Sequence, residues 1–296
     1  MIELRDGEWR LSYPGTSYTF GTTATPVWHR TTPDLGDVEI RSADVDRPRQ
    51  DGRAFGMDYR GGRTITFDMG IRGRTPEAVR EEASALQRAW RADAVRQTPG
   101  AVAELRIHYN GRERLVYGRP RRLALDFSEV AVNQYVGVVA DFACVDDLFY
   151  APDLNGVGFG IVPSLGGGLT APLRSPLSTT ATSDRSQGFR VSSEMPAWPI
   201  ITVDGPISNA VVTIGPDVRI EVRQDIGVGE TVVIDTQPGA RTAIRNGTAN
   251  VAGSLRGTRL SQASLLSGAY DVGLKGTDPT GTAAVRVDWR AVYSSL

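Results

Sequence analysis

The strongest constraint on the fold is the spacing of turn residues in the last third of the chain. From Trp198 onward, short runs rich in β-branched residues alternate with clusters of Gly, Pro, Asn and Asp. The runs cover Asn209 to Ile214, Val218 to Val222, Thr231 to Asp235, Leu265 to Lys275 and Thr282 to Tyr293. Short strands at near-regular spacing favour an antiparallel β-sandwich over a helical or α/β domain. We therefore predict a compact β-sandwich over residues 191–296.

A second domain is expected to precede this sandwich. Single cores usually stop growing near roughly 250 to 300 residues, so a chain of 296 residues has room for two. Hydrophobic residues make up 40% of the chain and charged residues 23%, a composition typical of folded proteins rather than disordered ones. We place the first domain at residues 1–150.

This first domain is predicted to contain a strand followed by one substantial helix. Apolar residues occupy every second position from Ile65 to Ile71, the pattern of a half-buried strand. Thr75-Pro76-Glu77 then supplies an N-cap, a proline at the first helical position and an acid in the first turn. An apolar stripe from Val79 to Trp90 predicts a helix, which Thr98-Pro99-Gly100 stops.

Further strands are expected after the helix. Asn110-Gly111 tolerates the positive φ angles of a type I′ turn and predicts a hairpin between the runs 105–109 and 115–117. Apolar residues alternate again over 123–127 and 136–144, and the last strand places Cys144 in the core. The first domain is therefore predicted to be mainly β with one helix, an α+β arrangement.

Periodicity fades between Asp146 and Ser193. Glycines gather at 156–160 and 166–168, and a Ser/Thr run covers 178–183. This composition is typical of a linker or an extended arm, so residues 151–190 are predicted to connect the two domains.

Charge and targeting signals narrow the possible partners. Lys plus Arg (33) nearly balances Asp plus Glu (34), so we expect no specific nucleic-acid recognition and no attraction to an anionic membrane. Lys275 is the only lysine, and arginine is the cation that protein interfaces favour. We expect no signal peptide and no membrane insertion, because no basic start with an apolar stretch and no run of 18 apolar residues occurs. The single cysteine fits a reducing cytoplasm.

No catalytic constellation emerges from the sequence. Cys144 lies inside an alternating strand and is interpreted as a structural thiol, while His108 faces away from its apolar neighbours and is interpreted as an exposed or interface residue. His29 and His108 are the only histidines, so a metal hydrolase would lack ligands. We therefore predict a non-enzyme with no catalytic residues, no cofactor and no metal site.

Two acid pairs and one arginine-rich stretch are further candidates for binding sites. Asp44-Val45-Asp46 and Asp146-Asp147 lack the spacing and third ligand of a cation site, so turn-forming or solvated acids are favoured. The glycine runs match no phosphate-binding motif. The arginine stretch could contact phosphates, but an exposed strand face or a protein interface is the preferred interpretation. Its members are Arg112, Arg114, Arg119, Arg121 and Arg122.

Taken in order, several segments resemble the distal tail proteins of bacteriophages with long non-contractile tails. Residues 51–58, 62–67 and 71–73 with the helix 75–90 resemble the strand-to-helix core of that family's N-terminal belt domain, and 141–150 its closing strand. Residues 199–293 are similar to its galectin-like sandwich. The matching motifs there are Val203-Asp204-Gly205-Pro206, Val233-Ile234-Asp235-Thr236 and Val287-Asp288-Trp289-Arg290.

The resemblance implies a belt domain built as a β-sheet or split barrel with one helix, followed by a galectin-like antiparallel β-sandwich. It also implies a hexameric ring in the virion tail tip, assembled in the bacterial cytoplasm. The tail tube protein would lie above the ring and the tail-tip hub below, with receptor-binding or other minor tail proteins as further partners. DNA would pass through the ring without being recognised.

A carbohydrate-binding module is the alternative function. Sugar sites usually stack an aromatic side chain against the sugar ring. Trp198, Tyr270, Trp289 and Tyr293 are available for this, although core packing is favoured for each. A cell-wall hydrolase would need two carboxylates across a rigid cleft, and the sequence shows no such pair.

Overall fold

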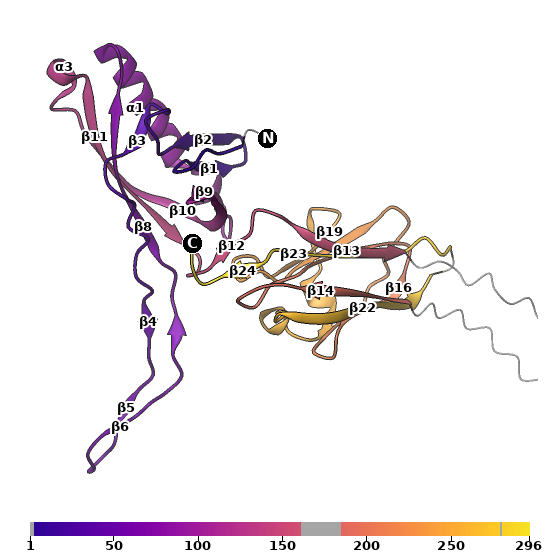
Figure 1. Ribbon diagram of the computed structural model, residues 1–296. Helices are drawn as coiled ribbons and strands as arrows, with labels where there is room; N and C mark the ends of the chain where they lie inside the picture. The colour runs from indigo at the N-terminus through magenta and orange to yellow at the C-terminus, as the bar shows by residue number, and fades with distance from the viewer. Residues whose placement is uncertain (1–2, 161–184, 279) are drawn as a thin grey trace, which may run out of the picture. The chain divides into compact units, whose positions relative to one another are not determined.

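The computed structural model describes residues 3–160, 185–278 and 280–296. The chain forms two compact units, one made of Met1–Pro152 with Tyr293–Leu296 and the other of Asp153–Val292. Strands dominate both units (Figure 1), which confirms the predicted mainly β class.

The first unit is a nearly closed antiparallel barrel. Its main sheet has the order β2-β1-β9-β10-β11-β8-β3. A bridge between Gly21 and Trp28 brings the two ends of this order together, and β12 (Phe149–Tyr150) pairs with β10 at Leu115. The strands are β1 (Trp9–Tyr13), β2 (Thr16–Phe20), β3 (Val27–His29), β8 (Thr64–Arg72), β9 (Ala103–Tyr109), β10 (Arg112–Asp126) and β11 (Tyr135–Cys144).

The predicted strand-to-helix unit of the barrel is present. Alternate residues of β8 from Ile65 to Ile71 are fully buried. Helix α1 (Pro76–Arg91) follows, and the Thr75 side chain accepts a hydrogen bond from the amide of Ala78 as its N-cap. The apolar stripe from Val79 to Trp90 is buried.

Helix α1 ends earlier than the stop predicted at residues 98–100. Ala92 adopts a left-handed conformation with φ 47°, which breaks the helix, and a short helix α2 (Asp93–Arg96) follows. The Arg96 guanidinium donates to the carbonyl of Pro120 at 2.6 Å. This contact attaches α2 to β10.

Aromatic side chains fill the barrel between β8 and α1. Trp9, Phe20 and Trp90 each meet Phe67 edge to face, with ring centroids 5.1, 5.5 and 5.9 Å apart. The Trp90 indole N–H donates to the carbonyl of Arg122 at 2.9 Å. His29 is half-buried and stacks on Phe67 in the same cluster, a position that the sequence alone does not indicate.

Strand β10 joins two strands that were predicted separately. The run 115–117 and the run 123–127 up to Asp126 lie on this one element, and Phe127 follows its end. The register against β11 shifts between Pro120 and Leu123. Proline has no N–H to donate to a neighbouring strand, which accounts for the irregularity. The hairpin before it turns at Asn110-Gly111 as predicted, with φ values of 51° and 68°.

The second unit is a sandwich of two antiparallel sheets. One sheet has the order β13-β23-β15-β18-β19-β20 and the other β14-β22-β16-β17-β21. The strands are β13 (Asn155–Gly160), β14 (Arg185–Val191), β15 (Ile200–Asp204), β16 (Ser208–Ile214), β17 (Val218–Val222), β18 (Thr231–Asp235), β19 (Thr242–Arg245), β20 (Ala249–Asn250), β21 (Leu255–Gly257), β22 (Gly268–Thr277) and β23 (Ala284–Trp289). Short 3₁₀ helices cover Ala252–Ser254 and Leu260–Gln262.

The segment predicted as a linker contains two of these strands. β13 pairs with β23 along its whole length, and β14 pairs with β22. Glycine suggested a linker, but a side chain at Gly156 would collide with the Asp288 carboxylate, so this glycine makes room for a neighbouring side chain. The glycine run 166–168 and the Ser/Thr run 178–183 lie outside the described residues.

The chain ends in the first unit rather than in the sandwich. The last strand, β24, covers Val292–Tyr293, and Tyr293–Leu296 belong to the first unit. Tyr293 and Leu296 pack against the barrel core, and the Arg114 guanidinium lies 3.9 Å from the Tyr293 ring centroid. The sandwich is thus an insertion between two parts of the first unit.

Candidate assembly interface

An extended excursion leaves the barrel between β3 and β8. Residues 37–61, called the arm below, run out and back as two paired segments (Figure 1). The segments pair at β4 (Ile40–Arg41) with β7 (Tyr59–Arg60), and at β5 (Val45–Asp46) with β6 (Arg53–Ala54). A two-stranded ribbon has no second layer of its own and is marginally stable in water by itself.

The arm carries large apolar side chains on its surface. Phe55 is 86% exposed and Met57 is 70% exposed, and Tyr59 follows at the spacing that places side chains on one face of an extended strand. Ile40 and Val45 on the outgoing segment are also exposed. Exposed apolar groups gathered on one surface element are typical of an interaction site.

Charged side chains on the arm are only partly paired within it. Arg53 forms ion pairs with Asp44 and Asp46, at 3.9 and 3.1 Å. Arg47 and Arg49 at the tip are exposed, and neither has an ion-pair partner among the described residues. The tip loop therefore exposes two arginines, with Asp51 as the acid beside them.

The root of the arm is fixed to the barrel. Arg60 forms an ion pair with the largely buried Asp147 carboxylate at 2.5 Å. Arg63 is buried, donates to the carbonyl of Asp147 and lies 4.5 Å from the Phe149 ring centroid. A side chain at Gly62 would collide with the carbonyl oxygen of Cys144, so the backbone there lies directly on β11. These contacts set the direction in which the arm leaves.

The two acid pairs therefore have structural partners. Asp44 and Asp46 bind Arg53 on the arm, as described above. Asp146 accepts from the Tyr150 hydroxyl at 2.6 Å, and burial raises its pKa. The described residues contain no group of three or more His, Cys, Asp or Glu side chains that could hold a metal ion.

A second exposed apolar surface lies at α3 (Val130–Asn133), after the end of β10. Phe127 and Val132 are exposed there, Val132 by 82%. Two carboxylates, Asp126 and Glu129, flank them and are also exposed. These four residues are called the α3 corner below. Figure 1 shows α3 at the opposite end of the first unit from the arm tip.

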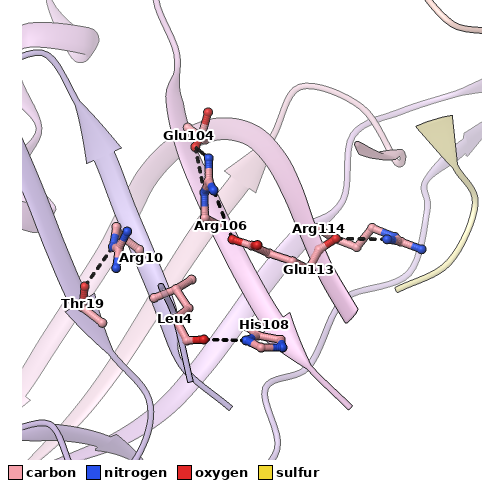
Figure 2. Close-up of polar contacts among 8 residues, drawn as sticks. All are labelled: Leu4, Arg10, Thr19, Glu104, Arg106, His108, Glu113 and Arg114. Carbon is pink, nitrogen blue, oxygen red and sulfur yellow. Dashed lines mark hydrogen bonds and ion pairs between the residues drawn. The ribbon is translucent and has the colours of Figure 1, made fainter. Parts of the chain in front are cut away.

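A polar face covers the outer side of the barrel at β1, β9 and β10. Arg106 donates to Glu104 and Glu113 at 3.3 and 3.1 Å, as Figure 2 shows. The same figure shows His108 Nδ1 donating to the carbonyl of Leu4 at 2.7 Å, and Arg10 donating to Thr19 at 3.1 Å. His108 is half-buried, and its interpretation as an exposed or interface residue stays a prediction.

The arginine-rich stretch is spread over several environments. Arg119 donates to the carbonyls of Ala101 and Thr98 at 2.7 and 2.8 Å, and Arg114 covers Tyr293. Arg112, Arg121 and Arg122 are exposed. The structure thus places the five arginines in different roles rather than in one patch.

Cys144 is half-buried at the end of β11. Burial raises the pKa of its thiol to about 12, with the nearby Asp146 carboxylate adding to the shift and Arg63 opposing it. A thiol nucleophile needs the opposite shift, toward the thiolate.

The aromatic residues proposed for sugar binding have other contacts. Trp289 is buried against Phe189 with centroids 4.8 Å apart, and Tyr270 stacks on the same ring at 5.8 Å. The Arg241 guanidinium lies 5.8 Å from the Trp198 ring, and Tyr293 is covered by Arg114. In the described strands of the sandwich, the positions that alternate with the buried ones carry no aromatic side chain.

The arm is the feature that sequence reasoning missed. Residues 51–58 were matched to the strand-to-helix core, whereas the structure places them on the exposed arm. Phe55, Met57 and Tyr59 alternate as core residues do, so their period alone could not reveal their exposure. The glycines at 52, 56, 61 and 62, which interrupt this run, were the available signal.

No known protein family and no curated protein matches the sequence. Among the described residues, no helix is long and apolar enough to cross a membrane. Similarity appears only when the chain is compared with solved structures.

The SPP1 phage Dit protein, described as a paradigm of the hub adsorption apparatus in phages infecting Gram-positive bacteria, matches with a TM-score of 0.52. The match has 12% identity and covers 96% of this chain and 99% of Dit. A chain of the phage P2 baseplate in its activated conformation matches with TM-scores of 0.53 with Ca and 0.54 with Sr, each at 12% identity over 95% of this chain and 97% of that one. Over nearly its whole length, the chain therefore has a fold similar to that of the SPP1 Dit protein and of this phage P2 baseplate chain.

Proposed function

We propose that this protein is a structural component of a phage tail tip, where it forms a hexameric ring that joins the tail tube to the tail-tip hub. The ring would be assembled in the host cytoplasm and retained in the virion. The tube protein would bind above it and the hub below, with receptor-binding or other minor tail proteins as possible further partners. No catalysis is part of this role.

The arm is the observation that carries the proposal. It presents Phe55, Met57 and Tyr59 to solvent although the barrel already has a complete core. Each such side chain gains about 1.5 to 3 kcal/mol when a partner buries it. A ring provides that partner for every copy, because heterologous contacts that close under rotation leave no arm uncovered.

The similarity to baseplate and hub structures supports the same role. It extends over nearly the whole chain, including both units, rather than over one widespread domain. Fold similarity does not by itself define an activity, so the number of copies and the neighbours in the tail are parts of the proposal.

Electron microscopy and native mass spectrometry of the purified full chain test the ring. We expect particles with six-fold symmetry, and we expect F55S/M57S to weaken ring association at least tenfold by removing apolar burial. V228S is the matched control, since Val228 is 80% exposed on the second unit. A wild-type chain that stays monomeric at every concentration, or assembles with another symmetry, would contradict the hexamer.

A glycan-binding role for the sandwich is not favoured by a specific observation. Trp289 is buried, and each of the other three aromatic side chains already contacts a ring or a guanidinium group of this chain. A glycan array probed with the full chain gives the direct measurement.

A further inference from the structure

We infer that the arm of one copy binds the α3 corner of the next copy. This inference rests on the proposed ring and names the two surfaces that would meet in it. Each copy would donate its arm at one side and accept a neighbour's arm at the other.

Apolar exposure on both surfaces is the first argument. Phe55 and Met57 on the arm and Val132 on the α3 corner are among the most exposed large apolar side chains of the first unit, at 86%, 70% and 82%. Phe127, which is 45% exposed, adds an aromatic ring to the same corner. Contact between the two surfaces would remove apolar area from water on both sides.

Charge complementarity is the second argument. The arm tip carries Arg47, Arg49 and one acid, Asp51, so its net charge is positive, and the α3 corner presents Asp126 and Glu129. None of these five side chains has an ion-pair partner among the described residues. Complementary charges at the edge of an apolar contact favour the correct partner and register.

Geometry makes the partner a second copy rather than the same chain. The arm tip and the α3 corner lie at opposite ends of the first unit (Figure 1). The Arg60–Asp147 ion pair and the close approach of Gly62 to β11 hold the root of the arm on the barrel.

The contact is heterologous, because an arm and a corner are different surfaces. Such a contact leaves one free arm and one free corner after every addition, until the chain of copies closes into a ring. Contact between two arms would instead give a closed dimer and leave both corners uncovered.

A disulfide between engineered cysteines tests this contact in the full chain. M57C and V132C place one thiol on each surface, and both side chains are exposed. Cys144 does not compete, because it is half-buried and its thiol pKa is raised to about 12. On mild oxidation, we expect the M57C/V132C double variant to give a ladder of crosslinked oligomers, whereas mixing the two single variants gives only dimers.

The controls separate the alternatives. Crosslinked dimers from M57C alone would show arm-to-arm contact, and a fast-migrating monomer from the double variant would show an arm folded onto its own copy. A ladder from M57C/V228C of equal yield would show random collision. Each of these results overturns the inference.

A charge exchange gives an independent readout. We expect R47E/R49E to shift the protein from rings toward monomers in light scattering, and the added changes D126R/E129R to restore the rings. If R47E/R49E forms rings as readily as the wild type, or if D126R/E129R gives no rescue, the corner is not the acceptor. Rings in the microscope without the crosslinked ladder would overturn this inference alone, whereas the absence of rings would also overturn the proposed function.

Discussion

His29 is a polar residue whose side chain is surrounded by aromatic rings. Its ring lies among Trp9, Phe20 and Phe67 with centroid distances of 5.7 to 5.8 Å. Both ring nitrogens are buried and have no hydrogen-bond partner among the described residues. Burial therefore lowers the pKa of His29 from 6.5 to about 4, because the charged ring would lose its hydration without compensation.

This lowered pKa predicts acid sensitivity of the first unit. Above pH 6.5 the ring is neutral in both the folded and the unfolded chain, so its contribution to stability is constant. Between pH 6.5 and about 4, His29 binds a proton in the unfolded chain but not in the folded chain, so the free energy of unfolding falls as the pH is lowered. The loss reaches on the order of 3 kcal/mol by linkage.

Urea denaturation across this pH range measures the effect. We expect H29L to lose less stability on acidification than the wild type, and H108Q, which changes the surface histidine, to behave like the wild type. An unchanged pH profile in H29L would mean that other groups cause the acid sensitivity.

The burial of Cys144 gives a second prediction at this scale, which concerns the reactivity of its thiol. Because burial raises its thiol pKa to about 12, the thiolate is scarce near neutral pH. We expect the native protein to react slowly with a maleimide and the urea-unfolded chain to react fast. Rapid labelling of the folded protein would show that the end of β11 opens readily.

At the scale of elements, a strand or helix is predictable from the sequence where the spacing of its apolar residues matches a single buried face. β8 and α1 each bury a single regular stripe, from Ile65 to Ile71 and from Val79 to Trp90, and both were identified. β13 was missed because glycine replaces the outward residues at 156, 158 and 160, which removes the polar half of the alternation.

The arm shows the opposite failure. Phe55, Met57 and Tyr59 alternate like core residues, yet they are exposed, since burial depends on which layer covers a strand and not on its sequence alone. The hexamer and the tail partners are expectations from family resemblance, and only the exposed fractions single out the residues of the proposed contact. The interface was therefore not predictable from the pattern.

Gly62 at the arm root gives a prediction at this scale. A methyl group there would collide with the carbonyl of Cys144, so we expect G62A to lower the free energy of unfolding by about 1 to 3 kcal/mol. G253A is the control, because nothing lies within 4 Å of the point that its added methyl group would occupy. Equal stability of the two variants in urea denaturation would mean that the arm root shifts without cost.

At the scale of the whole molecule, residues Tyr293–Leu296 return to the first unit and complete it. Tyr293 lies under the Arg114 guanidinium, whose Nε atom is buried without a hydrogen-bond partner among the described residues. We expect Y293A to destabilise the first unit by about 1 to 2 kcal/mol through lost cation–π contact and packing. Hydrogen exchange resolved by peptide should show faster exchange in β10 while the sandwich strands stay protected, and equal loosening of both units would contradict this assignment.

The insertion of the sandwich also sets an order of events during synthesis. Residues 153–292 leave the ribosome before Tyr293–Leu296. The contacts of Tyr293 and Leu296 with the barrel core can therefore form only after the whole sandwich has been translated. A chain cut short anywhere in the sandwich lacks the residues that finish the barrel. Premature termination within the sandwich therefore yields a product with an incomplete first unit.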